Sequence, residues 1–285
     1  MVRRTTDTDE PAWVENAAPT ERWPRLQLAQ LWIHRELIYF LALRDVKVRY
    51  KQAFLGVAWA GLQPLIGALA FTVLFNGLAD ITVDTDSYFV FALVGFIAWT
   101  YFSNALTSGT NSLLWNAELL TKVSLPRIAL PFAALLPPLV DLMVGAVLAV
   151  VITLVWGGGL SVVGLIVGVP IGTMLLLVAT LGPVFFFSAL IVRYRDVTAL
   201  VTFGLQLFLF VSPVGYPPEL VPAPWSTLQY LNPVAGCLAL LRWGLAGTAA
   251  PEPGHVAISV ATAVVVLVVG AYYFRANERQ FVDII

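Results

Sequence analysis

Positively charged residues are absent from four long intervals of this 285-residue chain, and these intervals constrain its fold more than any other feature. No lysine or arginine occurs in residues 52–121, 128–192, 196–241 or 243–274, although the chain contains 16 of them. Hydrophobic residues make up 59% of the chain and charged residues only 12%. One helix needs about 20 apolar residues to cross the hydrocarbon layer of a membrane. The pattern therefore predicts an all-α polytopic membrane protein.

Six membrane-spanning helices are expected within a transmembrane domain at residues 52–285. The first two intervals can each hold a pair of spans, the third holds one span and a shorter element, and the last holds one. Six crossings place both termini on the same side of the membrane. Fifteen of the sixteen basic residues lie on that side, and Arg242 is the exception. Because cytoplasmic loops are rich in Lys and Arg, both ends are expected in the cytoplasm. The spans are predicted near 54–78, 88–112, 128–155, 162–190, 198–215 and 255–274.

Three further segments are predicted outside the simple spans. Residues 1–26 are polar and contain prolines, so we expect a disordered cytoplasmic leader rather than a signal peptide. Residues 27–51 have a seven-residue apolar core flanked by charges. This core is too short to span, which is typical of an amphipathic helix lying in the membrane interface. Residues 216–247 hold several prolines and a short apolar stretch, which favours a re-entrant helical hairpin at the outer face.

A short cytoplasmic helix is predicted between the second and third spans, at residues 116–125. Asn116 can cap it, Glu118 and Lys122 form an i,i+4 pair, and Pro126 stops it. A plain turn between two spans would need only a few residues. The additional length favours a docking element for another protein.

Five motifs occur in an order that resembles one family of membrane transporters. They are similar to segments of the membrane subunits of polysaccharide and teichoic-acid ABC exporters, the type-2 permease family of O-antigen transporters. Each motif is short, and the ordered set, which covers the chain from residue 27, carries the resemblance. The motifs are RDVKVRYKQAFLGVAWAGLQP at 44–64, SLPRIALP at 124–131, RYRDV at 193–197, LNP at 231–233 and ERQFVDII at 278–285.

The resemblance implies a homodimer of six-span subunits joined to two copies of a separate ABC ATPase in the bacterial cytoplasmic membrane. Such an assembly moves a polyprenyl-diphosphate-linked polysaccharide to the outer face. This chain has no G-x-x-x-x-G-K-[ST] phosphate loop, so ATP and Mg²⁺ are expected on the partner subunit, and no cofactor or metal on this chain. Membrane lipid is a further expected partner. The net charge of −1 does not favour nucleic acid.

The composition also hints at the cargo. Arginine outnumbers lysine thirteen to three and the chain is rich in Ala and Val, which is typical of a high-GC genome. On that ground a cell-wall galactan is favoured over an O-antigen or a teichoic acid.

A set of basic residues beside the first span is the candidate substrate site. It could be an ordinary positively charged flank of a span. The resemblance implies instead an uptake gate for a lipid diphosphate, and Arg can bind phosphate with two N–H groups while Lys acts as a point charge. The candidate residues are Arg44, Lys47, Arg49, Tyr50 and Lys51.

Two other groups follow from the resemblance. The residues expected to couple the chain to the ATPase are Glu118, Lys122, Arg127, Arg193, Arg195 and Asp196, although the last three could simply cap the fourth span. Aromatic rings can stack on sugars, but they are also common in membrane-protein cores and interface belts. The aromatic residues that could line a glycan path are Trp59, Trp99, Tyr101, Phe102, Tyr216 and Tyr230.

Asp141 is the only ionisable residue predicted inside the hydrocarbon. Such a carboxylate marks either a function or a polar partner. Because Pro137 and Pro138 free backbone groups nearby, a structural role is favoured over proton coupling.

Two alternative functions remain open. The chain could be a type-2 ABC permease for another lipid or a drug. It could also be a membrane-embedded transferase acting on lipid-linked sugars, in which case Asp80, Asp84 and Asp86 of the first external turn would be needed.

Overall fold

A computed structural model describes most of the chain beyond its first 32 residues, and every regular element in the described part is a helix. The predicted leader at 1–26, the first residues of the predicted interface helix, and Asp84 and Asp86 lie outside the described residues. The described residues are 33–51, 56, 58–78, 80, 83, 87–122, 126–156, 158–222, 225–278 and 281.

Five helical stretches of the described chain are long and apolar enough to cross a membrane. They correspond to the first four and the last of the predicted spans. Three of them combine two helical segments, which are α3 and η1, α6 and α7, and η2 and α8. The segments are α3 (Ala58–Phe71), η1 (Thr72–Leu78), α4 (Tyr88–Trp115), α6 (Ala129–Ala133), α7 (Leu136–Val155), η2 (Gly164–Gly168), α8 (Val169–Arg193) and α12 (Pro253–Asn277).

The expected fifth span appears as a shorter helix, α9 (Val197–Val211), which has 15 residues. At about 1.5 Å per residue, such a helix is shorter than a hydrocarbon layer of about 30 Å. The segment that follows contains η3 (Pro218–Leu220), α10 (Trp225–Leu228), η4 (Gln229–Leu231) and α11 (Pro233–Leu245). Asn232 starts α11, because its side chain accepts a hydrogen bond from the Val234 N–H and Pro233 follows it at the first helical position.

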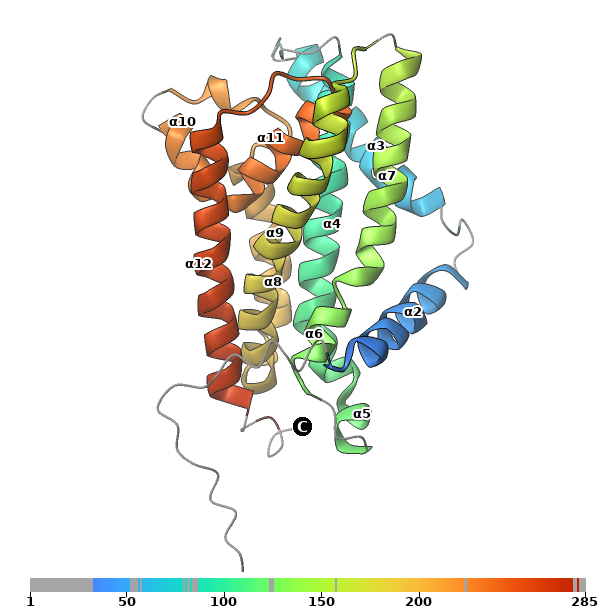
Figure 1. The fold of residues 1–285 in the computed structure, drawn as a ribbon, viewed down its shortest axis with the longest axis vertical. Helices are drawn as coiled ribbons and strands as arrows, with labels where there is room; N and C mark the ends of the chain where they lie inside the picture. Colours follow the sequence, from blue (N-terminus) through green and yellow to red (C-terminus); the bar gives the residue numbers. More distant parts are fainter. Residues whose placement is uncertain are drawn as a thin grey trace, which may run out of the picture.

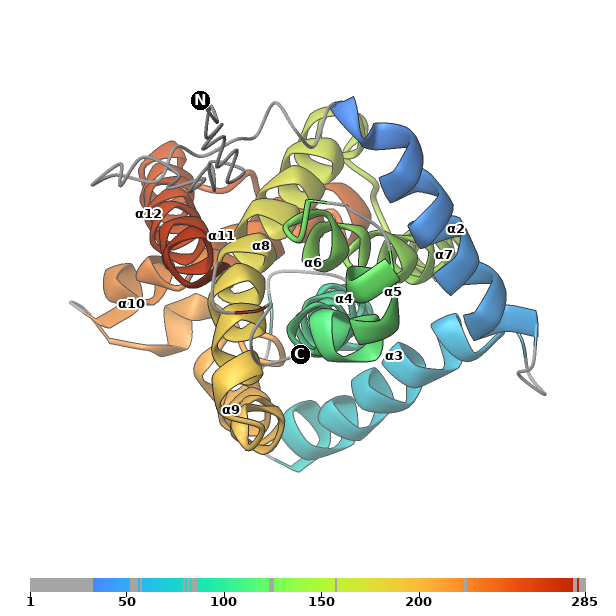
Figure 2. The ribbon, with the colours of Figure 1, turned by 90° about the horizontal axis from the view of Figure 1, so that it is seen from below.

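Helix α4 is the centre of the bundle. Figure 2 shows α3, α7, α8 and α9 around it, and most α4 side chains are buried. Helix α12 packs along most of the length of α8, on the side of α8 that faces away from α4 (Figure 2). Gly182 and Gly270 face each other there, and a Cβ added at Gly270 would lie 2.1 Å from the Gly182 carbonyl oxygen. The two backbones therefore touch, as small residues allow between membrane helices.

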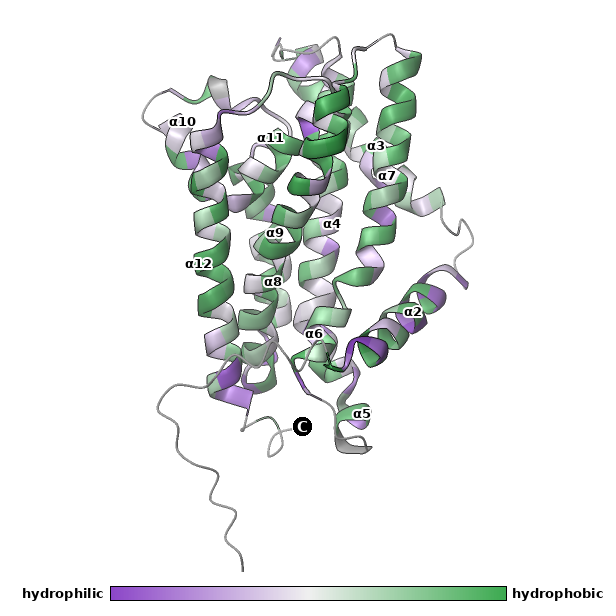
Figure 3. Cartoon of the chain, in the orientation of Figure 1, coloured by the Kyte–Doolittle hydropathy of each residue, from purple (hydrophilic) through white to green (hydrophobic). Residues whose placement is uncertain are grey.

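Different elements lie at the two ends of the bundle. Helix α2 (Arg35–Lys51), α5 (Ala117–Lys122) and the C-terminal ends of α8 and α12 lie at the lower end in Figure 1, whereas α10 lies at the upper end. Figure 3 shows that the spans are predominantly hydrophobic, while α2 mixes hydrophobic and hydrophilic residues. Helix α2 is therefore more polar than the spans, but its hydrophobic and hydrophilic residues are not segregated to opposite faces as the predicted amphipathic helix requires.

Candidate functional site

Helix α2 carries the basic residues of the candidate substrate site along the lower end of the bundle. Glu36 lies in its first turn, and Arg49 and Lys51 lie in its last turn. Charges in this order interact favourably with the helix dipole. Ile38, Leu41 and Ala42 are buried, and α2 contacts α6 and α7. The burial of these apolar side chains therefore packs α2 against α6 and α7.

The end of α2 is held by Asp141, the sixth residue of α7. The Arg49 Nη1 atom lies 3.2 Å from Asp141 Oδ2, and the Tyr50 hydroxyl donates a hydrogen bond to Asp141 Oδ1. The Asp141 side chain is only 9% exposed, whereas that of Arg49 is 35% exposed. Burial and the hydrogen bond to Asp141 raise the pKa of Tyr50 above its usual value, so the phenol remains protonated and donates.

These contacts were not predicted from the sequence. Asp141 was expected to bind backbone groups freed by Pro137 and Pro138, but side chains from α2 occupy both of its oxygen atoms. Arg49 and Asp141 are separated by more than 90 residues, so no local pattern could have paired them.

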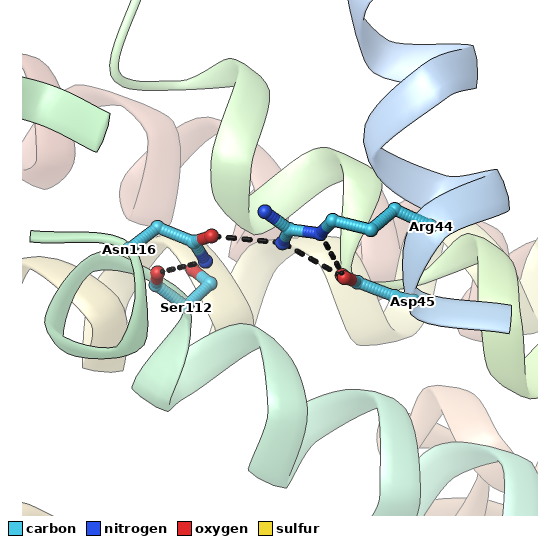
Figure 4. A network of polar contacts seen from close by, with 4 residues as sticks. All are labelled: Arg44, Asp45, Ser112 and Asn116. Atoms are coloured by element: carbon cyan, nitrogen blue, oxygen red, sulfur yellow. Dashed lines mark hydrogen bonds and ion pairs between the residues drawn. The ribbon is translucent and has the colours of Figure 1, made fainter. Parts of the chain in front are cut away.

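A second polar network connects α2 to the junction of α4 and α5 (Figure 4). Arg44 donates from Nε to Asp45 Oδ1 and from Nη2 to Asn116 Oδ1, each at 2.8 Å. The Asn116 amide in turn donates to the Ser112 carbonyl at 2.8 Å. Asn116, predicted as a cap for the next helix, therefore links the α4 backbone to Arg44.

The two networks border one cleft of about 530 Å³ between α2, α4, α6 and α7. Arg44, Asp45 and Arg49 line one side of it. Ser112 and Asn116 contribute polar groups from α4 and its C-terminal end, and the other lining residues are largely apolar. Lys47 and Lys51 are exposed and do not line this cleft. The structure thus brings Arg44, Arg49 and Tyr50 into contact with the bundle, and the cleft of mixed polarity lies between the two arginines and α4.

A larger cleft, of about 870 Å³, lies at the opposite end of the molecule. Arg242 lines it but is only 3% exposed, with its guanidinium 3.5 Å from the centre of the Phe91 ring. Its Nη2 atom donates to the Val214 carbonyl at 2.6 Å and its Nε atom to the Phe91 carbonyl at 3.3 Å. The one basic residue that the predicted topology placed apart from the others therefore binds α11 to α4 and to the turn after α9.

Tyr230 and His255 form a stacked pair in the wall of this larger cleft. Their ring centres lie 4.1 Å apart with the ring planes nearly parallel, and His255 Nδ1 lies 3.4 Å from a Glu252 oxygen. Within the described residues, no cluster of three His, Cys, Asp or Glu side chains could hold a metal ion. Asp80 has a positive φ of 50° and is the one residue of the external aspartate set that the structure describes.

Comparison with known proteins identifies the family. The profile of the ABC-2 type transporters matches residues 36–246, from the start of α2 to the end of α11. The chain belongs to the ABC-2 type transporter family. The resemblance inferred from the five motifs is thereby confirmed at the family level.

Several permeases are similar to this ABC-2 chain over nearly its whole length. The O-antigen export system permease protein RfbA of Klebsiella pneumoniae is 26% identical over 253 residues, which are 88% of this chain and 95% of the relative. The protein of the same name from Myxococcus xanthus is 26% identical over 256 residues, which are 89% of this chain and 97% of the relative. A second RfbA of Klebsiella pneumoniae is 24% identical over 251 residues.

The coupling residues expected for this ABC-2 chain lie at one end of the molecule. Helix α5 projects below the bundle, at the same end as the turn that joins α8 to α9 (Figure 1). Arg193, Arg195 and Asp196 are exposed in that turn. Glu118 is in the first turn of α5, whereas the side chain of Lys122 lies outside what the structure describes.

Arg127 is engaged inside the ABC-2 chain itself. Its Nη1 atom donates to the Glu278 carbonyl, and the Glu278 carboxylate pairs with Arg275 at 2.7 Å. The segment after α5 is therefore attached to the C-terminal end of α12. Phe281, which lies beyond the end of α12, is buried against Phe274 of that helix.

The six candidate aromatic residues of the ABC-2 chain do not gather in one place. Trp99, Tyr101 and Phe102 are buried in α4, and the first and third of these pack against Phe208 of α9. Trp59 is half exposed at the start of α3. Tyr216 donates to backbone carbonyls at the end of α9, and Tyr230 lines the larger cleft.

Proposed function

We propose that this chain is the permease subunit of an ATP-driven exporter that moves a polyprenyl-diphosphate-linked polysaccharide to the outer face of the bacterial cytoplasmic membrane. The observation that carries the proposal is the similarity to O-antigen export permeases over 88% of the chain, with ABC-2 family membership. The names of these relatives make an O-antigen-like glycan the first cargo to test. A galactan or a teichoic-acid-like polymer comes next.

The proposed topology has six crossings with both termini in the cytoplasm. Five crossings correspond to the long apolar helices, and α9 is the sixth, because local thinning of the bilayer can accommodate a short span. The segment at 216–247 would form a re-entrant hairpin at the outer face. This orientation is supported by the positions of Arg44, Arg127 and Arg193, which lie at the end that the positive-inside rule assigns to the cytoplasm.

The cleft beside α2 is the proposed site where the lipid head group is taken up. It combines two arginines with serine and asparagine groups at the level of an interface helix. Arginine binds phosphate oxygens with paired N–H donors, and the apolar remainder of the wall suits a polyprenyl chain. The exposed Lys47 and Lys51 would add long-range attraction for the diphosphate.

The proposed assembly is a homodimer of this chain with two copies of a separate ATPase, which holds ATP and Mg²⁺. Helix α5 and the exposed turn at 193–196 are the proposed docking elements, because both project at the proposed cytoplasmic end. Energy would reach the spans through Arg127, which joins the segment after α5 to α12.

The direct test is purification of the tagged full-length chain from its native host in a mild detergent. We expect an ATPase subunit to copurify in equal amount, and its hydrolysis rate to change when the host's lipid-linked glycan is added. A chain that purifies without an ATPase would refute the exporter assignment. An ATPase that responds to other lipids or drugs, and not to the glycan, would refute the proposed cargo.

A further inference from the structure

The Asp141 carboxylate is bound by the same groups of α2 that are proposed to bind the substrate. Arg49 contacts one carboxylate oxygen at 3.2 Å, and the Tyr50 hydroxyl donates to the other. Two consecutive side chains of an interface helix thus hold a single anion. That anion belongs to α7, a different helix of the same chain.

A carboxylate and a phosphate offer similar acceptors to such donors. Both present negatively charged oxygen atoms to a guanidinium and to a hydroxyl group, and charge-assisted hydrogen bonds to either are stronger than neutral ones. In the structure, Asp141 therefore occupies the position of an anionic ligand. Asp141 itself is shielded at 9% exposure, while Arg49 is accessible at 35%.

The cleft next to this contact is balanced in charge. Arg44 is bound by Asp45 and by the Asn116 amide, as Arg49 is bound by Asp141. Arg44 and Arg49 both line the cleft of about 530 Å³. An incoming diphosphate would therefore compete with a carboxylate of the chain for each guanidinium.

We propose that Asp141 is an internal competitor of the substrate diphosphate, and that it latches the end of α2 to α7 until a head group displaces it. This inference rests on the proposed function, because it assumes that α2 receives a lipid diphosphate. Binding of the head group transfers Arg49 and Tyr50 from the carboxylate to phosphate oxygens. The last turn of α2 is then released from α7, and lipid uptake is coupled to movement of the interface helix.

The latch makes a prediction opposite to that of a simple structural brace. If Asp141 only positioned α2, its removal would disorder the phosphate-binding groups and weaken ligand binding. If Asp141 competes, Asp141→Asn removes the competitor and leaves Arg49 without its counter-ion. Binding then becomes tighter by about ten- to a hundredfold, the effect expected for one lost charge-assisted contact.

The experiment measures binding of farnesyl diphosphate to the full-length chain in nanodiscs of phosphatidylcholine. Wild type is compared with Asp141→Asn, Arg49→Gln and the matched control Glu36→Gln, which removes the same charge from an exposed position in the first turn of α2. Farnesol and inorganic pyrophosphate separate the contributions of the chain and the head group. Hydrogen–deuterium exchange of the peptide that contains residues 44–51 is followed in wild type with and without farnesyl diphosphate.

We expect Asp141→Asn to bind farnesyl diphosphate more tightly, Glu36→Gln to bind it as wild type does, and Arg49→Gln to bind it more weakly. In wild type, the ligand should increase exchange at the end of α2. Unchanged or weaker binding by Asp141→Asn, with Arg49→Gln still impaired, would overturn the latch and leave the uptake site standing. A decrease of exchange on ligand binding to wild type would overturn it independently of any variant. If Arg49→Gln binds normally, both the uptake site and the latch are refuted.

Discussion

Replacement of Arg242 by methionine should destabilise the packing of α11 on α4. Methionine has a similar length and keeps the apolar contact with Phe91, but it removes the bonds to the Val214 and Phe91 carbonyls. Arg242 is 3% exposed, so little water can reach the carbonyls that it leaves. The Val214 carbonyl is then an unsatisfied buried acceptor, which costs about 1–3 kcal/mol, whereas the Phe91 carbonyl keeps its hydrogen bond within helix α4. The lost cation–π contact at 3.5 Å adds about 2 kcal/mol.

Part of this cost is offset, because the variant no longer buries a guanidinium. We therefore expect a net loss of about 3 kcal/mol, within the range for a broken buried polar network. For a chain of this size, such a loss lowers Tm by about 6–12 °C. Arg242→Lys, which retains the charge but not the planar fork, should fall between methionine and wild type.

The assay is thermal unfolding of the purified chain in detergent, followed by intrinsic fluorescence and by the amount of monodisperse protein after heating. Arg195→Met is the matched control, since Arg195 is exposed and its Tm should not change. Hydrogen–deuterium exchange should increase selectively in α11 and at the start of α4. If Arg242→Met unfolds within about 1 °C of wild type, Arg242 does not stabilise the packing of α11 on α4.

Three further predictions concern packing, docking and pH. Gly270→Ala should lower the Tm of the detergent-solubilised chain by several degrees, because the added Cβ would lie 2.1 Å from the Gly182 carbonyl oxygen. The control Gly204→Ala adds its Cβ in open space and should leave the Tm unchanged. Equal Tm values for the two variants would contradict the α8–α12 contact. In the Glu118→Ala variant of α5, the copurified ATPase should still hydrolyse ATP while glycan export falls severalfold. A normal amount of glycan exported per ATP hydrolysed would show that α5 does not couple the two processes. The folded-state pKa of Tyr50 is raised, so its proton is retained through neutral pH. As pH rises above the ordinary tyrosine pKa of about 10, the unfolded or undocked phenol ionises first, and docking of α2 weakens. Exchange of the α2 peptide, corrected for intrinsic rates, should therefore be constant from pH 6 to pH 9 and increase above about pH 10, and Tyr50→Phe should abolish that dependence.

The sequence predicted the helical class and most of the span boundaries, because both depend on local composition. An apolar helix must satisfy its backbone hydrogen bonds internally, so the length of each charge-free interval sets how many helices it can hold. The five long helices occur where those intervals place them. The fifth span was expected to continue to residue 215, but α9 ends at Val211, because Ser212 precedes Pro213 and a residue before proline is disfavoured in the helical conformation.

The partners of the charged residues could be decided only by the tertiary structure. The sequence singled out Arg49 and Asp141 for their type and position, but it did not show that α2 folds back onto α7 and joins them. Arg242 was recognised as an exception in the charge pattern, while its role depends on carbonyls of Phe91 and Val214 from distant segments. Hydropathy is a property of consecutive residues, and it therefore determined the membrane class and the helices. Ion pairs and clefts depend on which helix faces meet. Because the helices have similar apolar compositions, their sequences do not show which faces pack together, and only the tertiary structure does.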